Sequence, residues 1–388
     1  MMASRVERYC CGCGLCSGVC DHHIDARGYY RPTSDPEESG FDTSVCYCNS
    51  LTGAGNPSAP WGPLLTACYS WSSNPDVRHA ASSGGTLTAL CAHLLRNGMV
   101  DGVVQVSTDP EDPMRTTTVV SETPDEVLAC AGSRYTASSP YVGLFNRVDQ
   151  GKRYAVVAKP CDIRVLRSWL VGNADWKNTF PYLLSFFCGG TPTAQANDRL
   201  LASMGGSRDN LSSFRYRGCG WPGMTTAAFE GGTAAEMEYE KSWGQILGRD
   251  LQEVCRFCWE GTGEAADLSC GDGWYLVGGH PSFKEADGRN VTFARTKAGE
   301  ELLRSAVAAG VLETSPLEDL EVVNEMQPGQ CMRKSAMHSF ILAMRLARKQ
   351  TPSYSLRQLA CWQKRLPLAV RCKMFLGTLR RIASGKIE

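Results

Sequence analysis

Four cysteines near the amino terminus have the spacing of iron–sulfur ligands. Cys10, Cys13, Cys16 and Cys20 form a C-x2-C-x2-C-x3-C run, the pattern with which bacterial ferredoxins hold 4Fe-4S clusters. Two residues between cysteines let a tightly turning backbone present successive thiolates to one cluster, and the intervening glycines permit that turn. In two-cluster ferredoxins the fourth cysteine of such a run serves the other cluster, so Cys20 is the weakest of these four assignments.

A structural zinc site is the alternative for this run. Zinc sites with four cysteines normally separate two C-x2-C pairs by a longer loop, so the continuous run favours iron and sulfide. Ferredoxin runs usually continue into proline, whereas Asp21 follows here. Cys11 is a further candidate for the first ligand position. Cys46 and Cys48 form a C-x-C pair. This pair is the remnant of a second cluster site, or it supplies a distant ligand to the first cluster. We favour a third interpretation, in which both are free thiols in a loop.

Composition limits the class of protein. The 388 residues include 19 cysteines, and 43% are hydrophobic and 21% charged. These values are typical of a globular chain of two or three domains and exclude a fibrous or disordered one. We find neither a secretory signal nor an apolar run long enough to span a membrane. We therefore expect a cytoplasmic protein whose cysteines serve metal binding or redox chemistry rather than disulfides.

The middle of the chain alternates strand and helix patterns, which predicts an α/β core. Strands are expected over 100–107, 155–158 and about 182–187, and helices from Thr86 to Gly98 and after Asp162. Ligands of such cores gather at the carboxyl ends of the strands. Cys161 and Cys188 each follow a strand and should meet at that edge. Lys159 should lower the thiolate pKa of Cys161, making it a ligand or a nucleophile.

Two further features of the core bear on its chemistry. The small residues Ser82, Ser83, Gly84, Gly85 and Thr86 precede a helix, where backbone N–H groups can cradle a phosphate, although an ordinary helix cap has the same composition. None of the six histidines forms a recognisable Cys-His motif, so a thiol hydrolase is not favoured.

Six ordered motifs give the chain a family resemblance. They begin at Ser82, Gly132 (GSRY), Lys159 (KPCD), Phe187 (FCGG), Arg217 (RGCGWPG) and Cys255 (CRFC, continuing to Trp274). Together they resemble the coenzyme F420 hydrogenase/dehydrogenase beta-subunit family, from the cysteine run to about Pro316. That family includes deazaflavin-oxidising hydrogenase subunits, formate dehydrogenase subunits and 7-hydroxymethyl chlorophyll a reductase.

The resemblance implies an iron–sulfur flavoprotein oxidoreductase. FAD would bind the α/β core, and two 4Fe-4S clusters would relay single electrons between the flavin and a redox partner: coenzyme F420, ferredoxin or a partner subunit. The chain would either oxidise reduced coenzyme F420 or reduce an organic substrate with ferredoxin-type electrons. The alternative is a non-catalytic electron-transfer or cluster-binding adaptor of a larger redox complex.

The resemblance also assigns the site residues. The second cluster falls to Cys161, Cys188, Cys255 and Cys258, with Cys219 and Cys270 as substitutes. For FAD, the resemblance places Ser82, Ser83, Gly84, Gly85 and Thr86 near the pyrophosphate. Arg134 and Lys159 would supply positive charge, and Asp267 or Asp272 would lie near the isoalloxazine or the ribose. The organisation expected is a ferredoxin-like segment over residues 1–66, an FAD and iron–sulfur α/β domain over 67–328 and a basic helical tail over 329–388.

The tail departs from the family pattern. Residues 331–388 hold 13 basic residues and one acidic residue, although the whole chain has 40 of each. From Pro367 the spacing of Leu368, Cys372, Phe375, Leu379 and Ile382 predicts a basic amphipathic helix. Such a helix packs against the acidic body, the reading we favour, or binds an acidic partner or an anionic membrane surface as a peripheral protein. We expect no nucleic-acid partner.

Metal analysis of anaerobically purified protein tests the cysteine assignments. Two filled sites give about eight iron atoms per chain and an equal amount of acid-labile sulfide. About half as much iron would confine the chemistry to one site, and zinc without iron or sulfide would contradict both assignments.

Overall fold

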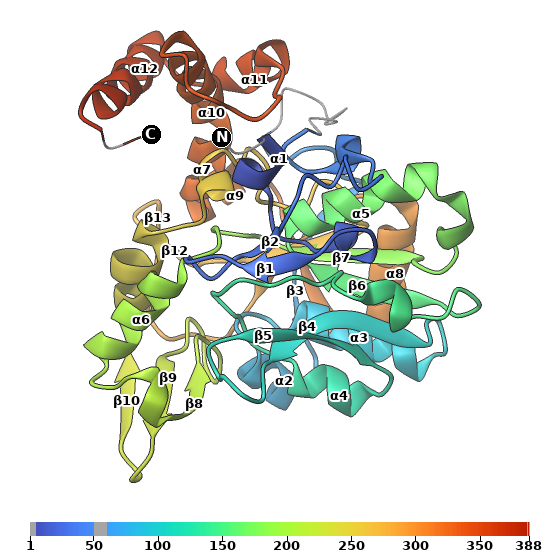
Figure 1. The fold of residues 1–388 in the computed structure, drawn as a ribbon. Coiled ribbons are helices and arrows are strands. Elements are labelled where there is room, and N and C mark those ends of the chain that lie inside the picture. The colour runs from blue at the N-terminus through green and yellow to red at the C-terminus, as the bar shows by residue number, and fades with distance from the viewer. Residues whose placement is uncertain (1–4, 50–59, 386, 388) are drawn as a thin grey trace.

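An eight-stranded mixed sheet forms the centre of the molecule in the computed structural model, which describes residues 5–49, 60–385 and 387 (Figure 1). The sheet order is β15 (Leu312–Pro316), β3 (Thr66–Ser72), β14 (Asn290–Ala294), β11 (Leu268–Asp272), β7 (Tyr182–Phe186), β6 (Tyr154–Ala158), β4 (Gly102–Thr108) and β5 (Thr116–Ser121). Strands β11, β7, β6 and β4 run parallel, whereas the remaining pairings are antiparallel. The predicted α/β class is confirmed.

Helices cover both faces of this sheet because its strands are apolar on both sides. Adjacent residues of a strand point to opposite faces. Val103 therefore packs with Leu90 of α3 (Thr86–Arg96) and Leu302 of α8 (Lys297–Ala308), whereas Val104 packs with Ile163 of α5 (Pro160–Gly172). The shorter helices α2 (Pro75–Ala80) and α4 (Pro124–Ala129) lie near α3.

The predicted strand–turn–helix succession is confirmed. The expected strands correspond to β4, β6 and β7, and the helix expected from Thr86 is α3. Helix α5 starts at Pro160, where the fixed φ of proline suits the first helical turn and its missing N–H leaves no bond unmade. Cys161 consequently lies in the first turn of α5, directly after β6.

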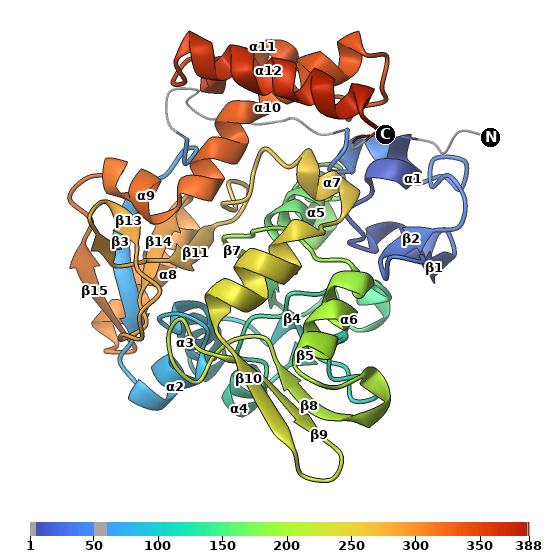
Figure 2. The same ribbon diagram turned by 90° about the vertical axis from the view of Figure 1, so that its left-hand side faces the viewer.

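A second, smaller sheet extends from the core (Figure 2). It joins β10 (Ala234–Met237), β9 (Thr225–Phe229) and β8 (Leu211–Arg215), all antiparallel, and packs with α6 (Ala194–Ser203). The chain then passes through α7 (Glu253–Arg256) before it returns to the large sheet at β11. A short hairpin of β12 (Leu276–Val277) and β13 (His280–Pro281) follows β11.

The two ends of the chain pack together over α5. The amino-terminal segment contains α1 (Arg5–Tyr9), β1 (His22–Ile24) and β2 (Tyr30–Pro32), and the tail contains α9 (Glu321–Met326), α10 (Pro328–Leu346), α11 (Leu356–Gln363) and α12 (Leu368–Ala383). The Tyr9 hydroxyl donates to the Gln350 carbonyl at 2.5 Å, and the Ser353 N–H donates to the Cys48 carbonyl at 3.0 Å. Both views place the tail helices beside the amino-terminal segment.

The tail prediction is correct for the helix and only partly correct for its apolar face. Phe375, Leu379 and Ile382 are half-buried, but Leu368 is 71% exposed and Cys372 is also exposed. The buried residue of α12 is Thr378, so the packed face is rotated from the predicted stripe. Docking of an acidic partner or an anionic membrane stays a prediction. None of the described helices combines the length and apolarity needed to cross a bilayer.

A buried ion pair fastens α10 to the core. The Lys334 ammonium pairs with the Glu264 carboxylate and donates to the Pro60 carbonyl at 3.1 Å, and both charged side chains are 4% exposed. Burial would raise the pKa of Glu264, but Lys334 and Arg295 hold that pKa below its ordinary value. The stabilisation is therefore present above pH 4.5, the ordinary pKa, and is lost as the pH falls through the lower value of the folded state.

Lys334→Ala should lower the free energy of unfolding by about 3–5 kcal/mol, because it leaves the Glu264 carboxylate buried without its partner. Chemical denaturation monitored by circular dichroism measures this change. The matched control is Lys373→Ala on the exposed side of α12, which should stay within about 0.5 kcal/mol of wild type. Equal stabilities for the two variants would contradict the structural role of the pair.

Candidate functional site: two thiol groups beside a polar cavity

Four cysteines from distant parts of the sequence converge beneath the tail. Cys161 comes from the first turn of α5, Cys188 follows β7, and Cys255 and Cys258 lie in and just after α7. The thiol of Cys188 has those of Cys255, Cys161 and Cys258 as its electrostatic neighbours. The structure therefore brings together the four cysteines predicted for the second cluster, which we term the inner thiol group.

The inner thiol group is surrounded by hydrogen-bond donors and a cation. The Thr191 N–H donates to Cys255 Sγ at 3.4 Å, and the Tyr47 hydroxyl lies 3.3 Å from Cys258 Sγ. Arg333 of α10 donates to the carbonyls of Cys188 and Gly189 at 3.2 and 2.6 Å and faces the Cys258 thiol. Donors and cations of this kind stabilise the negative charge of a thiolate-ligated cluster.

A buried lysine lies at the base of α5. Lys159 Nζ is 2.7 Å from the Asp162 carboxylate and donates to Ser138 Oγ at 2.6 Å. Burial alone would lower the pKa of Lys159, but Asp162 and Cys161 raise it above the ordinary value, so the ammonium stays charged. Its charge therefore faces the inner thiol group as predicted. However, the contact with Cys11, burial and Asp162 raise the pKa of Cys161, so the predicted lowering is absent.

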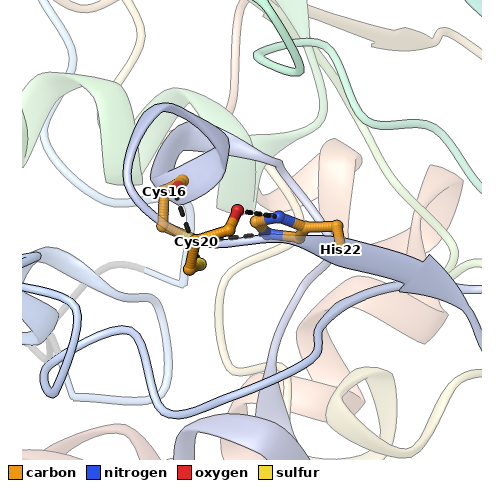
Figure 3. A group of neighbouring side chains, drawn as sticks. All are labelled: Cys16, Cys20 and His22. Carbon is orange, nitrogen blue, oxygen red and sulfur yellow. Dashed lines mark hydrogen bonds between the residues drawn. The ribbon is translucent and has the colours of Figure 1, made fainter.

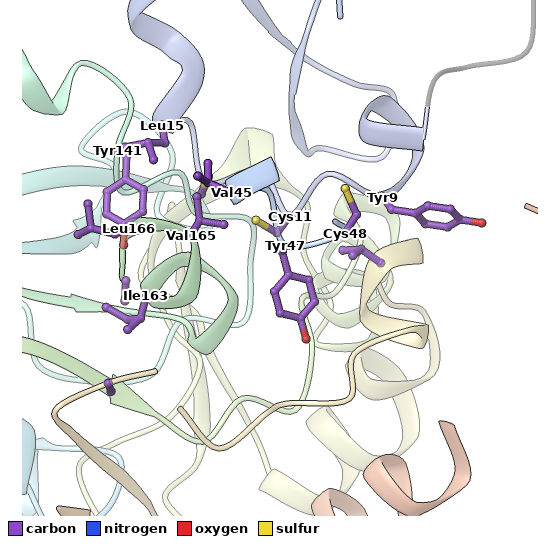
Figure 4. Close-up of a cluster of buried hydrophobic side chains, with 14 of the residues drawn as sticks. Tyr9, Cys11, Leu15, Val45, Tyr47, Cys48, Tyr141, Ile163, Val165 and Leu166 are labelled. Atoms are coloured by element: carbon purple, nitrogen blue, oxygen red, sulfur yellow. The ribbon is translucent and has the colours of Figure 1, made fainter. Parts of the chain in front are cut away.

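A second set of cysteines lines a small cavity in the amino-terminal segment. Its lining includes Cys10, Cys11, Cys13, Cys16, Cys46 and Cys48 among apolar side chains. Figure 4 shows Cys11 and Cys48 within this buried cluster, beside Tyr47 and Val45. The contact with Cys11 lowers the pKa of Cys13, but burial outweighs it and raises that pKa to about 11. Cysteines held as neutral thiols in this way release their protons when a metal binds.

Cys20 lies beside this cavity rather than in its lining. Its Sγ donates to the Cys16 carbonyl at 3.4 Å, while Cys16 Sγ lies 3.2 Å from His22 Nε2 (Figure 3). The ligand atoms of these three residues all lie within 4.8 Å of one another. The structure therefore groups Cys20 with Cys16 and His22.

The predicted flavin residues lie around a cavity at the carboxyl ends of the parallel strands. Its lining includes Ser82, Ser83, Gly85, Thr86, Arg134, Lys159 and Asp272. Gly84 supports this turn from behind, since a Cβ there would lie 2.7 Å from the Ser70 carbonyl oxygen. The turn can therefore approach the sheet only because residue 84 has no side chain.

The charge of this cavity suits an anionic ligand. Its charged lining residues are Arg134, Lys159, Arg217 and Asp272, so the cations outnumber the carboxylate. The Asp272 carboxylate accepts two hydrogen bonds from the Nη1 and Nη2 atoms of Arg217, at 2.9 and 2.8 Å. Arg134 donates to the Cys130 carbonyl at 2.8 Å, which fixes its guanidinium at the cavity wall. A pyrophosphate in this cavity would meet these cations together with the N-terminal end of α3.

Three other predicted residues lie elsewhere or have a different contact. Asp267 is absent from the cavity lining, because its carboxylate binds the Leu183 N–H, Thr296 Oγ1 and Arg167 at 2.7, 2.7 and 2.9 Å. Cys219 is exposed to solvent. Cys270 is buried, and its Sγ lies 3.4 Å from Thr292 Oγ1. Neither substitute is among the electrostatic neighbours of Cys188.

Several side chains of the site were missed by sequence reasoning. No sequence motif marks Arg333 or Tyr47 as a site residue. Each contacts the inner thiol group only because the two end segments of the chain pack against the core. Arg217 did carry a signal, since it begins the RGCGWPG motif and is a buried cation. A buried arginine needs a carboxylate partner, which here is Asp272.

The residue types fit the groups that the sequence predicts. Clustered, half-buried thiols with donors and a cation suit an iron–sulfur cluster, and the cationic cavity beside a helix start suits a dinucleotide phosphate. Cys188 belongs to the inner thiol group and also lines the cavity.

Comparison with known proteins agrees with these features. Residues 67–146 match the coenzyme F420 hydrogenase/dehydrogenase beta-subunit N-terminal family, and residues 151–320 match its C-terminal counterpart. The coenzyme F420 hydrogenase subunit beta of Methanococcus voltae is 27% identical over 68% of this chain and 88% of its own length. The F420-dependent formate dehydrogenase 1 subunit beta of Methanococcus maripaludis is 27% identical over 63% of this chain and 60% of its own length.

A plant enzyme and a solved structure extend the comparison. The 7-hydroxymethyl chlorophyll a reductase of Oryza sativa subsp. japonica is 25% identical over 60% of this chain and 47% of its own length. A chain of the F420-reducing [NiFe] hydrogenase complex from Methanosarcina barkeri shares the fold, with a TM-score of 0.57 and 20% identity over 76% of this chain and 98% of that one. The chain belongs to the coenzyme F420 hydrogenase/dehydrogenase beta-subunit family.

Proposed function

We propose that this chain is an iron–sulfur flavoprotein oxidoreductase that relays electrons between FAD and two 4Fe-4S clusters. FAD would lie in the cavity lined by Ser82 and Arg134, and the inner thiol group would hold one cluster. The amino-terminal cysteine run would hold the other. When bound, the flavin supplies hydride chemistry and single-electron transfer, and the clusters carry one electron each.

The observation that carries this proposal is that Cys188 belongs to both the cavity and the inner thiol group. It lines the cationic cavity and is an electrostatic neighbour of Cys161, Cys255 and Cys258. A ligand in the cavity would therefore lie next to the inner thiol group. Electron transfer between two centres requires this proximity, whereas a binding protein without redox chemistry does not.

The residues around the cavity have separate roles in this proposal. Arg134 and Lys159 would neutralise phosphate charge, and Ser82 and Thr86 would orient the ligand at the start of α3. Arg217 and Asp272 hold each other through two hydrogen bonds, so they would give the cavity a fixed wall. Arg333 and Lys159 would offset the negative charge of a cluster in the inner thiol group.

The names of the relatives suggest two candidates for the redox partner. The relatives include subunits named for coenzyme F420 hydrogenase and F420-dependent formate dehydrogenase, so reduced coenzyme F420 and a partner subunit are our first candidates. Ferredoxin as a donor to an organic substrate is the second, because a chlorophyll reductase is also related.

Absorption spectroscopy of the anaerobically purified chain tests the proposal. Flavin bands near about 450 nm should be superimposed on the broad iron–sulfur absorption. The bands should bleach with reduced coenzyme F420 or reduced ferredoxin. A cluster spectrum without flavin would instead indicate a cluster-binding adaptor, and a colourless protein would contradict both functions.

Arg134→Gln should weaken FAD binding about tenfold, because it removes a cation from the cavity wall and costs about 1.4 kcal/mol. Equilibrium titration of the deflavinated protein with FAD measures the dissociation constant. The control is Arg304→Gln on the exposed side of α8, which should bind FAD as wild type does. Equal dissociation constants for both variants would remove Arg134 from the FAD site.

A further inference from the structure

The cavity in the amino-terminal segment has more cysteines than one cluster needs. Its lining cysteines are Cys10, Cys11, Cys13, Cys16, Cys46 and Cys48. Cys20, the fourth cysteine of the run, is not among them. A cubane cluster takes four thiolates, so the cavity raises the question of which side chain completes the set begun by Cys10, Cys13 and Cys16.

Two of the six cysteines, Cys11 and Cys48, have neighbours at the inner site as well as among the amino-terminal cysteines. Cys11 Sγ lies within 4.8 Å of both Cys161 Sγ and an Asp162 carboxylate oxygen. Cys48 is an electrostatic neighbour of Tyr354, which also has Cys258 and Cys161 as neighbours. Both side chains therefore lie between the two sites rather than at the amino-terminal cysteine run alone.

Cys46 faces the run instead. Its electrostatic neighbours are Cys48, Cys10, Cys16 and Asp42, all in the amino-terminal segment, and it lines the cavity with the three cysteines. The backbone at this position is fixed, because Cys46 caps the short helix η2 (Thr43–Val45) and Val45 is buried in the core. The Asp42 side chain accepts the Ser44 N–H at 2.9 Å and fixes the start of the same helix.

Cys20 has a different environment. Its Sγ lies within 4.8 Å of Cys16 Sγ and near Cys10, but it donates to the Cys16 carbonyl at 3.4 Å and is not part of the cavity lining. Ferredoxins with two clusters provide the chemical precedent, since the fourth cysteine of a run there leaves the cluster of the first three. A cysteine from elsewhere in the chain then supplies the missing thiolate.

We infer that Cys46 supplies the fourth thiolate of the amino-terminal cluster in place of Cys20, so that the ligands are Cys10, Cys13, Cys16 and Cys46. This inference rests on the proposed function, since it concerns a cluster of that function. The cysteine thiols become thiolates on binding, and their protons are released to solvent. No oxidation or reduction of the protein is involved in this step.

The assignment also places the two sites in contact. The residue after Cys46 is Tyr47, whose hydroxyl lies 3.3 Å from Cys258 Sγ in the inner thiol group. A ligand of one cluster and a hydrogen-bond partner of the other thus stand next to each other in the sequence. The effects of substituting Cys46 should therefore be measured separately at each cluster.

Three single variants of the full chain test the inference: Cys46→Ala, Cys20→Ala and the matched control Cys48→Ala. Cys46→Ala should lose between about one and four iron atoms per chain from the wild-type content of about eight. Cys20→Ala and Cys48→Ala should keep the full content. Iron and sulfide quantitation gives these values, and electron paramagnetic resonance of the reduced protein identifies which cluster is changed.

The inference is overturned if Cys46→Ala keeps the wild-type iron content or if Cys20→Ala loses as much iron as Cys46→Ala. A wild-type chain without iron would instead contradict the proposed function itself. Retention of the resonance of the inner cluster shows that a variant has folded. If Cys46→Ala does not fold, Cys46→Ser provides the second test, because an oxygen ligand should shift the resonance of the amino-terminal cluster alone. An unchanged resonance in Cys46→Ser would overturn the inference.

Discussion

Burial of groups that carry or acquire charge is the constraint on which the structure around the cysteines depends. Desolvation disfavours thiolates, and it raises the pKa of Cys16, Cys46 and Cys188 in the thiol form of the protein. Cations are placed at both thiol groups: Arg31 donates to the Cys10 carbonyl, and Arg333 faces Cys258. Arg31 lies on β2, which pairs with β1, and Arg333 lies on α10, which packs chiefly with α11 and α12. The charge balance of the sites therefore depends on how the two end segments of the chain pack.

The sheet explains why a ligand cavity and a thiol group can be neighbours. Parallel strands β4, β6, β7 and β11 end at one edge, and residues in the second halves of these strands or directly after β6 and β7 line the cavity. The same connections lead into α5 and the loop of Cys188. Local strand–turn–helix geometry thus determines where both the cationic wall and two of the inner cysteines lie.

The sequence was sufficient for the features that depend on local pattern. Strand periodicity located β6 and β7, and Pro160 fixed the helix start that carries Cys161. The sequence was insufficient for side-chain positions that depend on packing between distant parts of the chain. The position of Cys46 depends on η2 being held against α5, and the face of α12 that becomes buried depends on which surface of α10 it meets. Asp267 looked like a ligand residue, yet β7, Arg167 and Thr296 occupy its carboxylate.

The contact between the two chain ends has a consequence for biosynthesis. The amino-terminal segment is synthesised before residues 350–353, to whose backbone groups Cys48 and Tyr9 are hydrogen-bonded. Until those residues emerge, these two hydrogen bonds cannot form. The amino-terminal segment can therefore reach its final packing only after residues 350–353 have been synthesised.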